Sequence, residues 1–372
     1  MKAVSIAVIG NGRWARALSV RLKHNQRQWR ARLRRAMLYQ PPPDLPRLST
    51  FAEPSELAIR VPSSSQPKRA GGGGGGGGDE TLQMTADALM FAAGEVYAES
   101  IDISELRDAD LMILAVPASK VKPLLRSIVG VLRPEQAMVH AIGSFAPVEG
   151  AGRQSMLPVS ELIRRETPIT QIGAIAGPAL AEDLEEDIPV SVVCGSLSPD
   201  VAPMVHQGFH GQHVRVYNSS DLIGVEVARA LVGVYGFAIG VADAMELGPA
   251  VRSLLIARGV AEMARLSVAL GGQERTFFGP AGLGELIVAT ERRGAPDFQL
   301  GKLIGKGASL GDAARQIDRA CDALNMIREG QMHAQRLRLT LPIVHALYRW
   351  VGGRHDLRAC ITDLLEKDLF LL

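Results

Sequence analysis

The sequence predicts an α/β protein in which a doubly wound parallel sheet is followed by an all-helical second domain. Three observations support this fold class. Short apolar runs rich in β-branched residues alternate with helical segments over about the first 200 residues, as in sheets built from βαβ units. From about Asp221 the strand signal stops and long helical patterns follow. The 372 residues also suffice for two domains of ordinary size, which we place over residues 1–205 and 206–372.

The first 40 residues have the pattern of a strand, a glycine turn, a helix and a second strand. Val4–Ile9 is a short β-branched run of the kind buried on both faces of a parallel sheet. The turn Gly10–Gly12 follows, and Trp14–Leu22 carries apolar residues at helical spacing. A second strand is predicted within Leu33–Tyr39, after a strongly basic stretch over residues 27–35.

Regular patterning fades over residues 41–80. This segment contains PPP, SSS and an unbroken run of eight glycines, Gly71–Gly78, out of 39 glycines in the chain. Such composition costs too much conformational entropy to order. We therefore expect an irregular insertion or linker inside the first domain.

Beyond the insertion the alternation of strands and helices resumes. Further strands are predicted at Asp110–Pro117, Gln136–Ile142, Ile172–Ile175 and Val190–Cys194, with a helix at Ser119–Leu132 after the first of them. The helical part is predicted to comprise Asp221–Leu247, Pro249–Leu270, Leu283–Thr290 and the stretches 309–336 and 341–350. Because Asp221–Leu247 is rich in glycine and alanine, we expect it to be a central helix that its neighbours approach closely.

Charge and composition exclude several function classes. The 41 Lys+Arg and 39 Asp+Glu give a net charge of +2, without the basic domain typical of nucleic-acid binders. The longest apolar run, Ala230–Ala242, has 13 residues, whereas a membrane span needs about 20. We expect a soluble protein with neither nucleic-acid nor membrane partners.

Cysteine and histidine spacing gives no indication of a metal site. The three cysteines are far apart and form no C-x-x-C pair, which argues against zinc or disulfides and favours a reducing, cytoplasmic setting. His206, His210 and His213 have helical spacing, but Gly208 and Gly211 interrupt the helix and no acidic residue joins them. We therefore predict no metal.

The glycine turn carries the first chemical signal. Gly10, Gly12 and Ala15 form the pattern G-x-G-x-x-A between a strand and a helix. The first glycine permits a tight turn, the second lets the backbone approach a pyrophosphate, and the small third residue lets helix and strand pack. The pattern predicts a Rossmann-type dinucleotide-binding domain. The second strand ends in Tyr39–Pro41 without an acidic residue for a ribose 2′-hydroxyl, while Arg13 lies in the turn, which favours NADP and leaves NAD open.

Six stretches carry a resemblance to a known family. They are IAVIGNGRWARAL, DADLMILAVPASKVKPLL, AGPALAEDL, RVYNSSDLIGVEVARAL, ARGVAEMARLSVALG and FFGPAGLGELIVAT. In order and spacing they resemble NAD(P)-dependent glycerol-3-phosphate dehydrogenase along nearly the whole chain except residues 41–80. The resemblance implies an active site between the two domains and reduction of dihydroxyacetone phosphate to sn-glycerol 3-phosphate, a phospholipid precursor. It also implies NAD or NADP as cofactor and a cytoplasmic homodimer formed through the helical domain.

The resemblance also implies which residues form the site. It assigns cofactor contacts to Gly10, Asn11, Gly12, Arg13, Trp14, Ala15, Pro117, Ala181 and Asp322, and the substrate cleft to Gly177, Ala179 and Val232.

Two lysines of the family are missing. Where the family has T-K-G after the third strand, residues 141–144 read AIGS, with Gly143 in the lysine position. Where it has A-L-K-N, whose lysine donates or accepts the proton, residues 230–233 read ALVG, with Val232 in the lysine position. Hydride transfer to a ketone builds negative charge on its oxygen, and neither glycine nor valine can stabilise or protonate that oxygen.

Four further family positions differ. The aspartate of G-L-G-D becomes Glu285, the glutamate of V-E-G becomes Asp322, and a serine after Pro178 becomes Ala179. The S-R-N segment that holds the substrate phosphate aligns with residues 295–297, APD, so its arginine is lost. Without that arginine a dianionic phosphate lacks its bidentate partner.

Three residues are candidate replacements in catalysis. His140 lies three residues before Gly143 and titrates near neutral pH, but it can equally be a buried histidine beside the sheet. Lys120 follows the turn at Pro117, where a solvated lysine at a helix start is equally consistent. Glu285 can retain a carboxylate role or simply be an acidic residue at a helix N-terminus.

Three functions remain open from the sequence. The chain can be an active family dehydrogenase, although the missing lysines leave its catalysis uncertain. It can be a catalytically degenerate relative that binds a dinucleotide or a partner as a sensor or scaffold. It can also be a dehydrogenase with a shifted substrate, one lacking phosphate, that uses His140 or Lys120.

Overall fold

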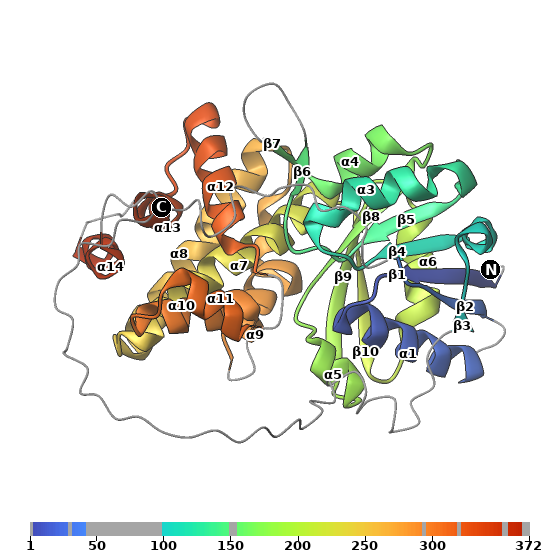
Figure 1. The fold of residues 1–372 in the computed structure, drawn as a ribbon, viewed down its shortest axis with the longest axis horizontal. Helices are drawn as coiled ribbons and strands as arrows, with labels where there is room; N and C mark the ends of the chain where they lie inside the picture. Colours follow the sequence, from blue (N-terminus) through green and yellow to red (C-terminus); the bar gives the residue numbers. More distant parts are fainter. Residues whose placement is uncertain are drawn as a thin grey trace, which may run out of the picture.

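The computed structural model describes residues 3–28, 32–41, 99–148, 155–291, 295–317, 321–351 and 356–366. The insertion predicted over residues 41–80, including the glycine run, lies outside the described residues except for Pro41. The described chain has a sheet part and a helical part, drawn at the right and left of Figure 1.

Eight of the described strands form one sheet in the order β10-β9-β8-β5-β4-β1-β2-β3. The strands are β1 (Val4–Ile9), β2 (Leu33–Tyr39), β3 (Glu99–Ser100), β4 (Leu111–Leu114), β5 (Ala137–His140), β8 (Gln171–Ala176), β9 (Val190–Ser196) and β10 (Val214–Ser219). From β3 to β8 all neighbours are parallel, whereas β9 is antiparallel to β8. The doubly wound parallel sheet predicted from the sequence is thus confirmed, with a reversed edge that the sequence did not indicate.

Helices cover both faces of this sheet because its strands are apolar on both sides. They are α1 (Arg13–Gln28), α3 (Ala118–Ile128), α4 (Val159–Glu166), α5 (Ala181–Glu185) and α6 (Val201–Phe209). Leu22 of α1 and Val205 of α6 pack with Ile6 on one face, and Leu125 of α3 and Ile163 of α4 pack with Met112 on the other. In Figure 1, α3 and α4 lie above the sheet and α1 below it.

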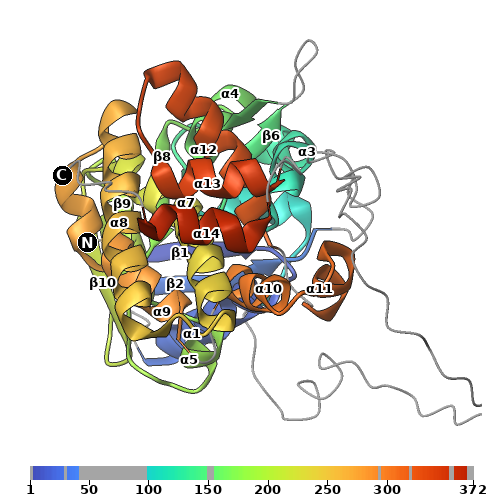
Figure 2. The ribbon, with the colours of Figure 1, turned by 90° about the vertical axis from the view of Figure 1, so that its left-hand side faces the viewer.

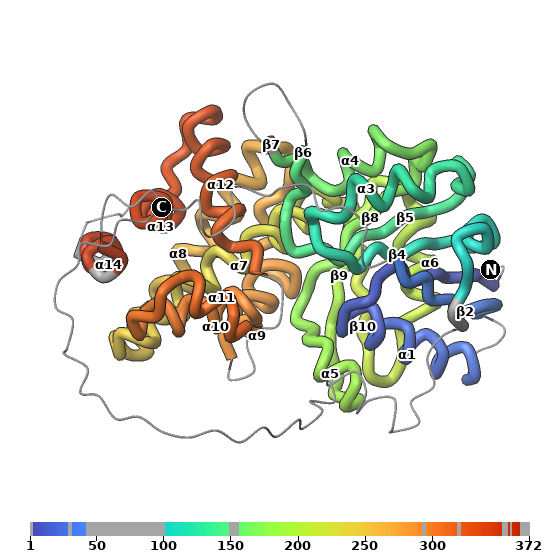
Figure 3. Tube along the Cα trace, viewed as in Figure 1, coloured from blue at the N-terminus to red at the C-terminus, as the bar shows by residue number. Residues whose placement is uncertain are grey.

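The helical part is built around one long apolar helix, α7 (Leu222–Ala244). The others are α8 (Gly248–Ala269), α9 (Glu285–Ala289), α10 (Pro296–Gly305), α11 (Leu310–Gln316), α12 (Ala323–Leu337), α13 (Pro342–Val351) and α14 (Leu357–Glu366). In Figure 2, α12, α13 and α14 face the viewer, and α14 lies at the end remote from the sheet (Figure 3).

Close backbone contact between α7 and α10 explains the small residues of α7. A Cβ atom at Gly240 would lie 2.2 Å from the Phe298 carbonyl oxygen, and one at Gly301 would lie 2.1 Å from that of Phe237. The expected central helix is therefore confirmed. By length and composition α7 could cross a membrane, because its most apolar 18-residue stretch has a mean hydropathy of 1.7. However, 83% of that stretch is buried inside the protein.

Several elements differ from the sequence prediction. The stretch 309–336 forms two helices, α11 and α12, and α10 and α14 were not expected. The unexpected strand β10 pairs with β9 and extends the sheet to Ser219. A short hairpin, β6 (Ala146–Val148) and β7 (Ser155–Leu157), stands apart from the main sheet. The domain boundary near residue 205 stays a prediction.

Candidate active site

The glycine turn lies where the strand order reverses, at the carboxyl ends of β1 and β4, which is where such sheets bind ligands. The Gly10 N–H donates to the Tyr39 carbonyl oxygen at 3.0 Å. A Cβ at Gly10 would lie 2.3 Å from the Ala115 carbonyl oxygen and 2.9 Å from the Ala15 Cβ. Close packing between β1, β4 and α1 thus requires a glycine at position 10 and a small residue at position 15.

Gly12 is different, because a Cβ there would meet no described atom within 4 Å. The fold itself therefore does not require glycine at this position. A ligand that approaches the backbone at the start of α1 would require it, as a pyrophosphate does. Trp14 lies beside this turn and packs on the same apolar cluster as Ala181, predicted to contact the cofactor, and Ala179, predicted to line the substrate cleft.

Arg13 is held by two glutamates that the sequence analysis missed. Its guanidinium donates to Glu182 at 2.7 Å and to Glu185 at 2.5 and 2.9 Å. The hydrogen bond to Glu185 and the charges of both carboxylates raise the pKa of Arg13. Because Arg13 is already paired with two carboxylates of α5, it gives little support for a 2′-phosphate, and the choice between NAD and NADP stays open.

Glu285 joins the sheet part to the helical part. Its Oε2 accepts a hydrogen bond from the Gly177 N–H at 2.7 Å, and its Oε1 forms an ion pair with Arg229. Gly177, at the end of β8, has a φ of +126°, and a Cβ there would lie 2.7 Å from the Ser191 carbonyl oxygen. Burial raises the pKa of the Glu285 carboxyl, whereas Arg229 and the Gly177 N–H act to lower it. Glu285 is therefore at the site, and its catalytic role stays a prediction.

Arg229 is the residue that sequence reasoning missed at the centre of the site. A Cβ at Gly143 would lie 3.8 Å from the Arg229 Nε and 3.9 Å from its Cζ and Nη2. The guanidinium thus lies over the position from which a side chain at residue 143 would start. One signal could have found it: Glu226 and Arg229 are the charged residues in the apolar first half of α7, and charged side chains in such surroundings usually have partners.

Asp297 and Asp322 form an acidic pair, and the charge of Arg229 acts on both carboxyls. The Asp297 Oδ1 accepts from the Ala323 N–H at 3.0 Å. Its Oδ2 lies 2.5 Å from where a Cβ at Gly233 would be, so it occupies the space of that side chain. Burial and the charge of Asp322 raise the pKa of Asp297 to about 7. Burial raises the pKa of Asp322 to about 6, and Arg229 acts against this shift.

His140 is buried among structural partners. At the end of β5 its Nε2 lies 3.2 Å from the Glu226 Oε1. Glu226 also accepts from the Ser160 N–H at 2.9 Å and from the Ser160 Oγ at 2.5 Å. Burial would raise the pKa of Glu226, but His140 and Ser160 lower it overall. This is the environment of a histidine beside the sheet, and a catalytic role for His140 stays a prediction.

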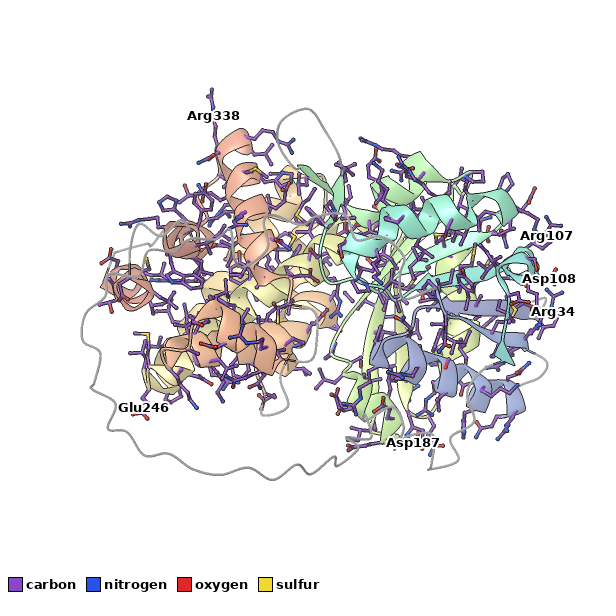
Figure 4. The ribbon with its side chains drawn as sticks, in the orientation of Figure 1. Arg34, Arg107, Asp108, Asp187, Glu246 and Arg338 are labelled. Carbon is purple, nitrogen blue, oxygen red and sulfur yellow. The ribbon has the colours of Figure 1, made fainter. Side chains whose placement is uncertain are left out.

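The remaining predicted residues lie around this centre. Lys120 is half-buried in the first turn of α3, where its N–H donates to the Pro117 carbonyl oxygen at 2.9 Å. Val232 is buried one turn after Arg229 on α7. Arg34, Arg107 and Asp108 lie at the far end of the sheet part, away from the helical part (Figure 4), so Arg34 of the basic stretch is remote from the site.

The histidines give no support for a metal site. Among the described residues no group of three or more His, Cys, Asp or Glu side chains could hold a metal ion. The rings of His206 and His210 stack with centroids 3.9 Å apart, and the His210 Nδ1 accepts from the Val216 N–H at 3.1 Å.

Family models match both parts of the chain. The model for the "NAD-dependent glycerol-3-phosphate dehydrogenase N-terminus" matches residues 96–202, and the model for the "NAD-dependent glycerol-3-phosphate dehydrogenase C-terminus" matches residues 221–362. The matched ranges include Gly177, Arg229 and Glu285, whereas the glycine turn precedes both ranges.

Individual relatives agree with these matches. Glycerol-3-phosphate dehydrogenase (NAD(P)+) of Carboxydothermus hydrogenoformans is 32% identical over 246 residues, which are 66% of this chain and 71% of that protein. The protein of the same name from Pseudomonas aeruginosa (strain LESB58) is 32% identical over 263 residues, 71% of this chain and 75% of its own.

Solved structures show the same fold at lower identity. The glycerol-3-phosphate dehydrogenase of Coxiella burnetii has a TM-score of 0.75 at 21% identity, covering 98% of this chain and 99% of its own. That of Plasmodium falciparum also has a TM-score of 0.75, at 15% identity, covering 99% of this chain and 96% of its own.

Proposed function

The chain belongs to the NAD-dependent glycerol-3-phosphate dehydrogenase family, and we propose that it interconverts dihydroxyacetone phosphate and sn-glycerol 3-phosphate with NAD(H) or NADP(H). One observation carries this proposal beyond family membership. Arg229 and Glu285 of the helical part meet Gly143 and Gly177 of the sheet part, so cationic and anionic groups converge beside the edge where the glycine turn lies.

The residues around the glycine turn fit a dinucleotide. The packed Gly10 and the open Gly12 leave the first N–H groups of α1 available to a pyrophosphate, and Trp14 and Ala181 offer apolar surface beside it. When bound, the cofactor supplies or accepts the hydride. The chain's own residues orient the substrate, stabilise charge on its oxygen and move a proton.

A second candidate function is dinucleotide binding without turnover. Gly143 and Val232 stand in the positions of the family lysines, and Pro296 stands in that of the family arginine. A sensor or scaffold would retain the glycine turn and dispense with these side chains. A dehydrogenase acting on a substrate without phosphate is consistent with the same losses.

Turnover and binding assays on the purified protein separate these candidates. With dihydroxyacetone phosphate and NADH, or NADPH in a parallel assay, we expect oxidation of the cofactor. No turnover together with calorimetric binding of NADH would support the second candidate. Turnover with dihydroxyacetone but not with its phosphate would support a shifted substrate. Absence of both binding and turnover would overturn both dehydrogenase functions and reduce the second candidate to a scaffold that binds a partner.

The setting of the protein is part of the proposal. The protein acts in the cytoplasm, where it supplies a precursor of phospholipids. It forms a homodimer through the helical part and has neither nucleic-acid nor membrane partners. Exposed apolar side chains of the helical part, at Leu254, Val268, Phe278 and Ile287, support a dimer contact there. Sedimentation of the full chain tests this, and a monomer at micromolar concentration would contradict it.

A further inference from the structure

The structure places a positive charge beside Gly143, where the sequence alone shows only that the family lysine is missing. Gly143 has no side chain, yet the Arg229 guanidinium lies 3.8–3.9 Å from where its Cβ would be. Arg229 comes from α7, in the other part of the molecule, one turn before Val232. A cation is thus present beside residue 143 although neither lysine position holds one.

The orientation of Arg229 is fixed in a way that leaves donors for a ligand. Its Nη1 pairs with Glu285, which the Gly177 N–H holds in turn. Its Nε and Nη2 are the atoms nearest the empty side-chain position of Gly143. A guanidinium has five N–H donors in a rigid plane, and 32% of this side chain is exposed.

We propose that Arg229 is a catalytic residue of this chain: its guanidinium binds the reacting oxygen of the substrate and stabilises the negative charge that hydride transfer creates there. This inference rests on the proposed function and adds to it a residue at a position where no lysine is found. Charge stabilisation of this kind acts mainly in the transition state, where the oxygen becomes anionic.

The step also needs a proton, which Arg229 cannot give because a guanidinium stays protonated in proteins. The hydride brings its electron pair to the carbonyl carbon, the carbonyl π pair moves to the oxygen, and the oxygen takes a proton to become the alcohol. Asp297 is the donor the geometry favours. Its carboxyl lies against Gly233, which is four residues after Arg229 and therefore on the same face of α7.

The groups that face Asp297 set its titration. Asp322 and Cys321 precede α12, Arg229 lies on α7, and the Ala323 N–H donates to the Asp297 Oδ1. Of these, Asp322 disfavours the ionised carboxyl, while Arg229 and the Ala323 N–H favour it. Asp297 is half-buried and can recover its proton from water.

Moving the charge back to residue 143 tests the role of Arg229. We expect Arg229→Ala to lower kcat/KM for dihydroxyacetone phosphate by about 10²- to 10³-fold, mostly through kcat. Adding Gly143→Lys to Arg229→Ala should restore at least about tenfold of this loss, because the ammonium returns near the same place. Arg107→Ala, which removes an exposed arginine at the far end of the sheet part, is the matched control.

A second variant tests Asp297 as the proton donor. Asp297→Asn should abolish the fall of the reduction rate as pH rises through about 7.

The outcomes separate this inference from the proposed function. If the wild type turns over and Arg229→Ala does so equally well, the role of Arg229 is wrong while the function stands. If Asp297→Asn leaves the pH profile unchanged, Asp297 is not the donor. If the wild type has no turnover, the proposed function is wrong and the catalytic role of Arg229 fails with it.

Discussion

Glu285 in the helical part accepts a hydrogen bond of 2.7 Å from the backbone N–H of Gly177 at the end of β8. Glu285 also pairs with Arg229, so one buried carboxylate ties β8, α7 and α9 together. A carboxylate in this position holds the two parts of the protein in register and orients the cation of the site.

Substitutions at Glu285 should separate these two tasks. Glu285→Gln keeps an oxygen for the Gly177 N–H and loses the charge, whereas Glu285→Ala leaves both Gly177 and Arg229 without this partner. We expect Glu285→Ala to lower the free energy of unfolding by about 1–3 kcal/mol, and Glu285→Gln to lower it less. Urea denaturation measures both, and equal effects would show that the hydrogen bond to Gly177 contributes nothing.

The two glycines of the turn should respond differently to substitution. Gly10→Ala places a Cβ against the Ala115 carbonyl oxygen, so both the melting temperature and NADH binding should fall. Gly12→Val meets open space, so the melting temperature should stay unchanged while NADH affinity falls by at least about tenfold, since the ligand needs that space. Thermal unfolding and calorimetry on both variants are the measurement. Full NADH affinity of Gly12→Val would remove the turn from the cofactor site.

Freeing Arg13 should change the choice of cofactor. Glu182→Gln with Glu185→Gln removes two negative charges that hold the Arg13 guanidinium. We expect the double variant to gain affinity for NADPH relative to NADH by several-fold, because a released arginine can pair with the 2′-phosphate. Calorimetry with both cofactors on wild type and variant checks this. An unchanged ratio would mean that Arg13 does not reach the ribose.

The fold was largely predictable because its signals are local. The apolar runs of β1, β4 and β5 are recognised from neighbouring residues alone, as is the glycine turn, and the structure confirms them. The edge strand β10 was missed because the other strands were recognised as continuous apolar runs, whereas Val214–Ser219 alternates buried and exposed residues, as a half-buried strand does. The direction of β9 depends on its pairing with β8, which no pattern within the strand specifies.

The site was harder to predict, because its key contacts join residues far apart in sequence. Arg229 and Gly143 come together through the packing of α7 on the sheet, and motif alignment marked only the position that lost its lysine. Gly233 likewise looked like the loss of a polar side chain. The structure shows that its space is taken by Asp297, 64 residues later in the chain.

Removing His140 should destabilise the protein through Glu226. His140→Ala leaves the buried Glu226 carboxylate without the imidazole nitrogen that lies 3.2 Å away, and leaving a buried polar group without a partner typically costs about 1–3 kcal/mol. Adding Glu226→Gln should recover part of this loss. The pKa of Glu226 is lower in the folded protein than in the unfolded chain. Its contribution to stability is therefore present above the unfolded pKa and is lost as pH falls through the folded pKa. Urea denaturation of the single and double variants at several pH values measures both effects, and unchanged turnover of the double variant would remove His140 from the mechanism.

The pH dependence of stability should contain an opposite contribution from Glu262 on α8. Its carboxyl is buried and accepts from the Ile343 N–H at 2.7 Å. Burial raises its pKa to about 7 from an ordinary value of 4.5, although the N–H groups of Ile343 and Val344 act to lower it. Because the folded state holds this proton more tightly, the contribution to stability is fully present below pH 4.5 and is lost as pH rises to about 7.

Glu262→Gln should therefore flatten the stability profile over this range. The wild type is expected to lose on the order of 3 kcal/mol from this group between the two pH limits, and the variant should lose much less. Glu161→Gln on α4 is the matched control. Glu161 is partly exposed, and because Arg165 lowers its pKa, this carboxyl should affect the pH dependence of stability in the other direction. Urea denaturation at half-unit pH steps is the measurement. A Glu262→Gln profile parallel to that of the wild type would show that folding does not raise the pKa of this carboxyl.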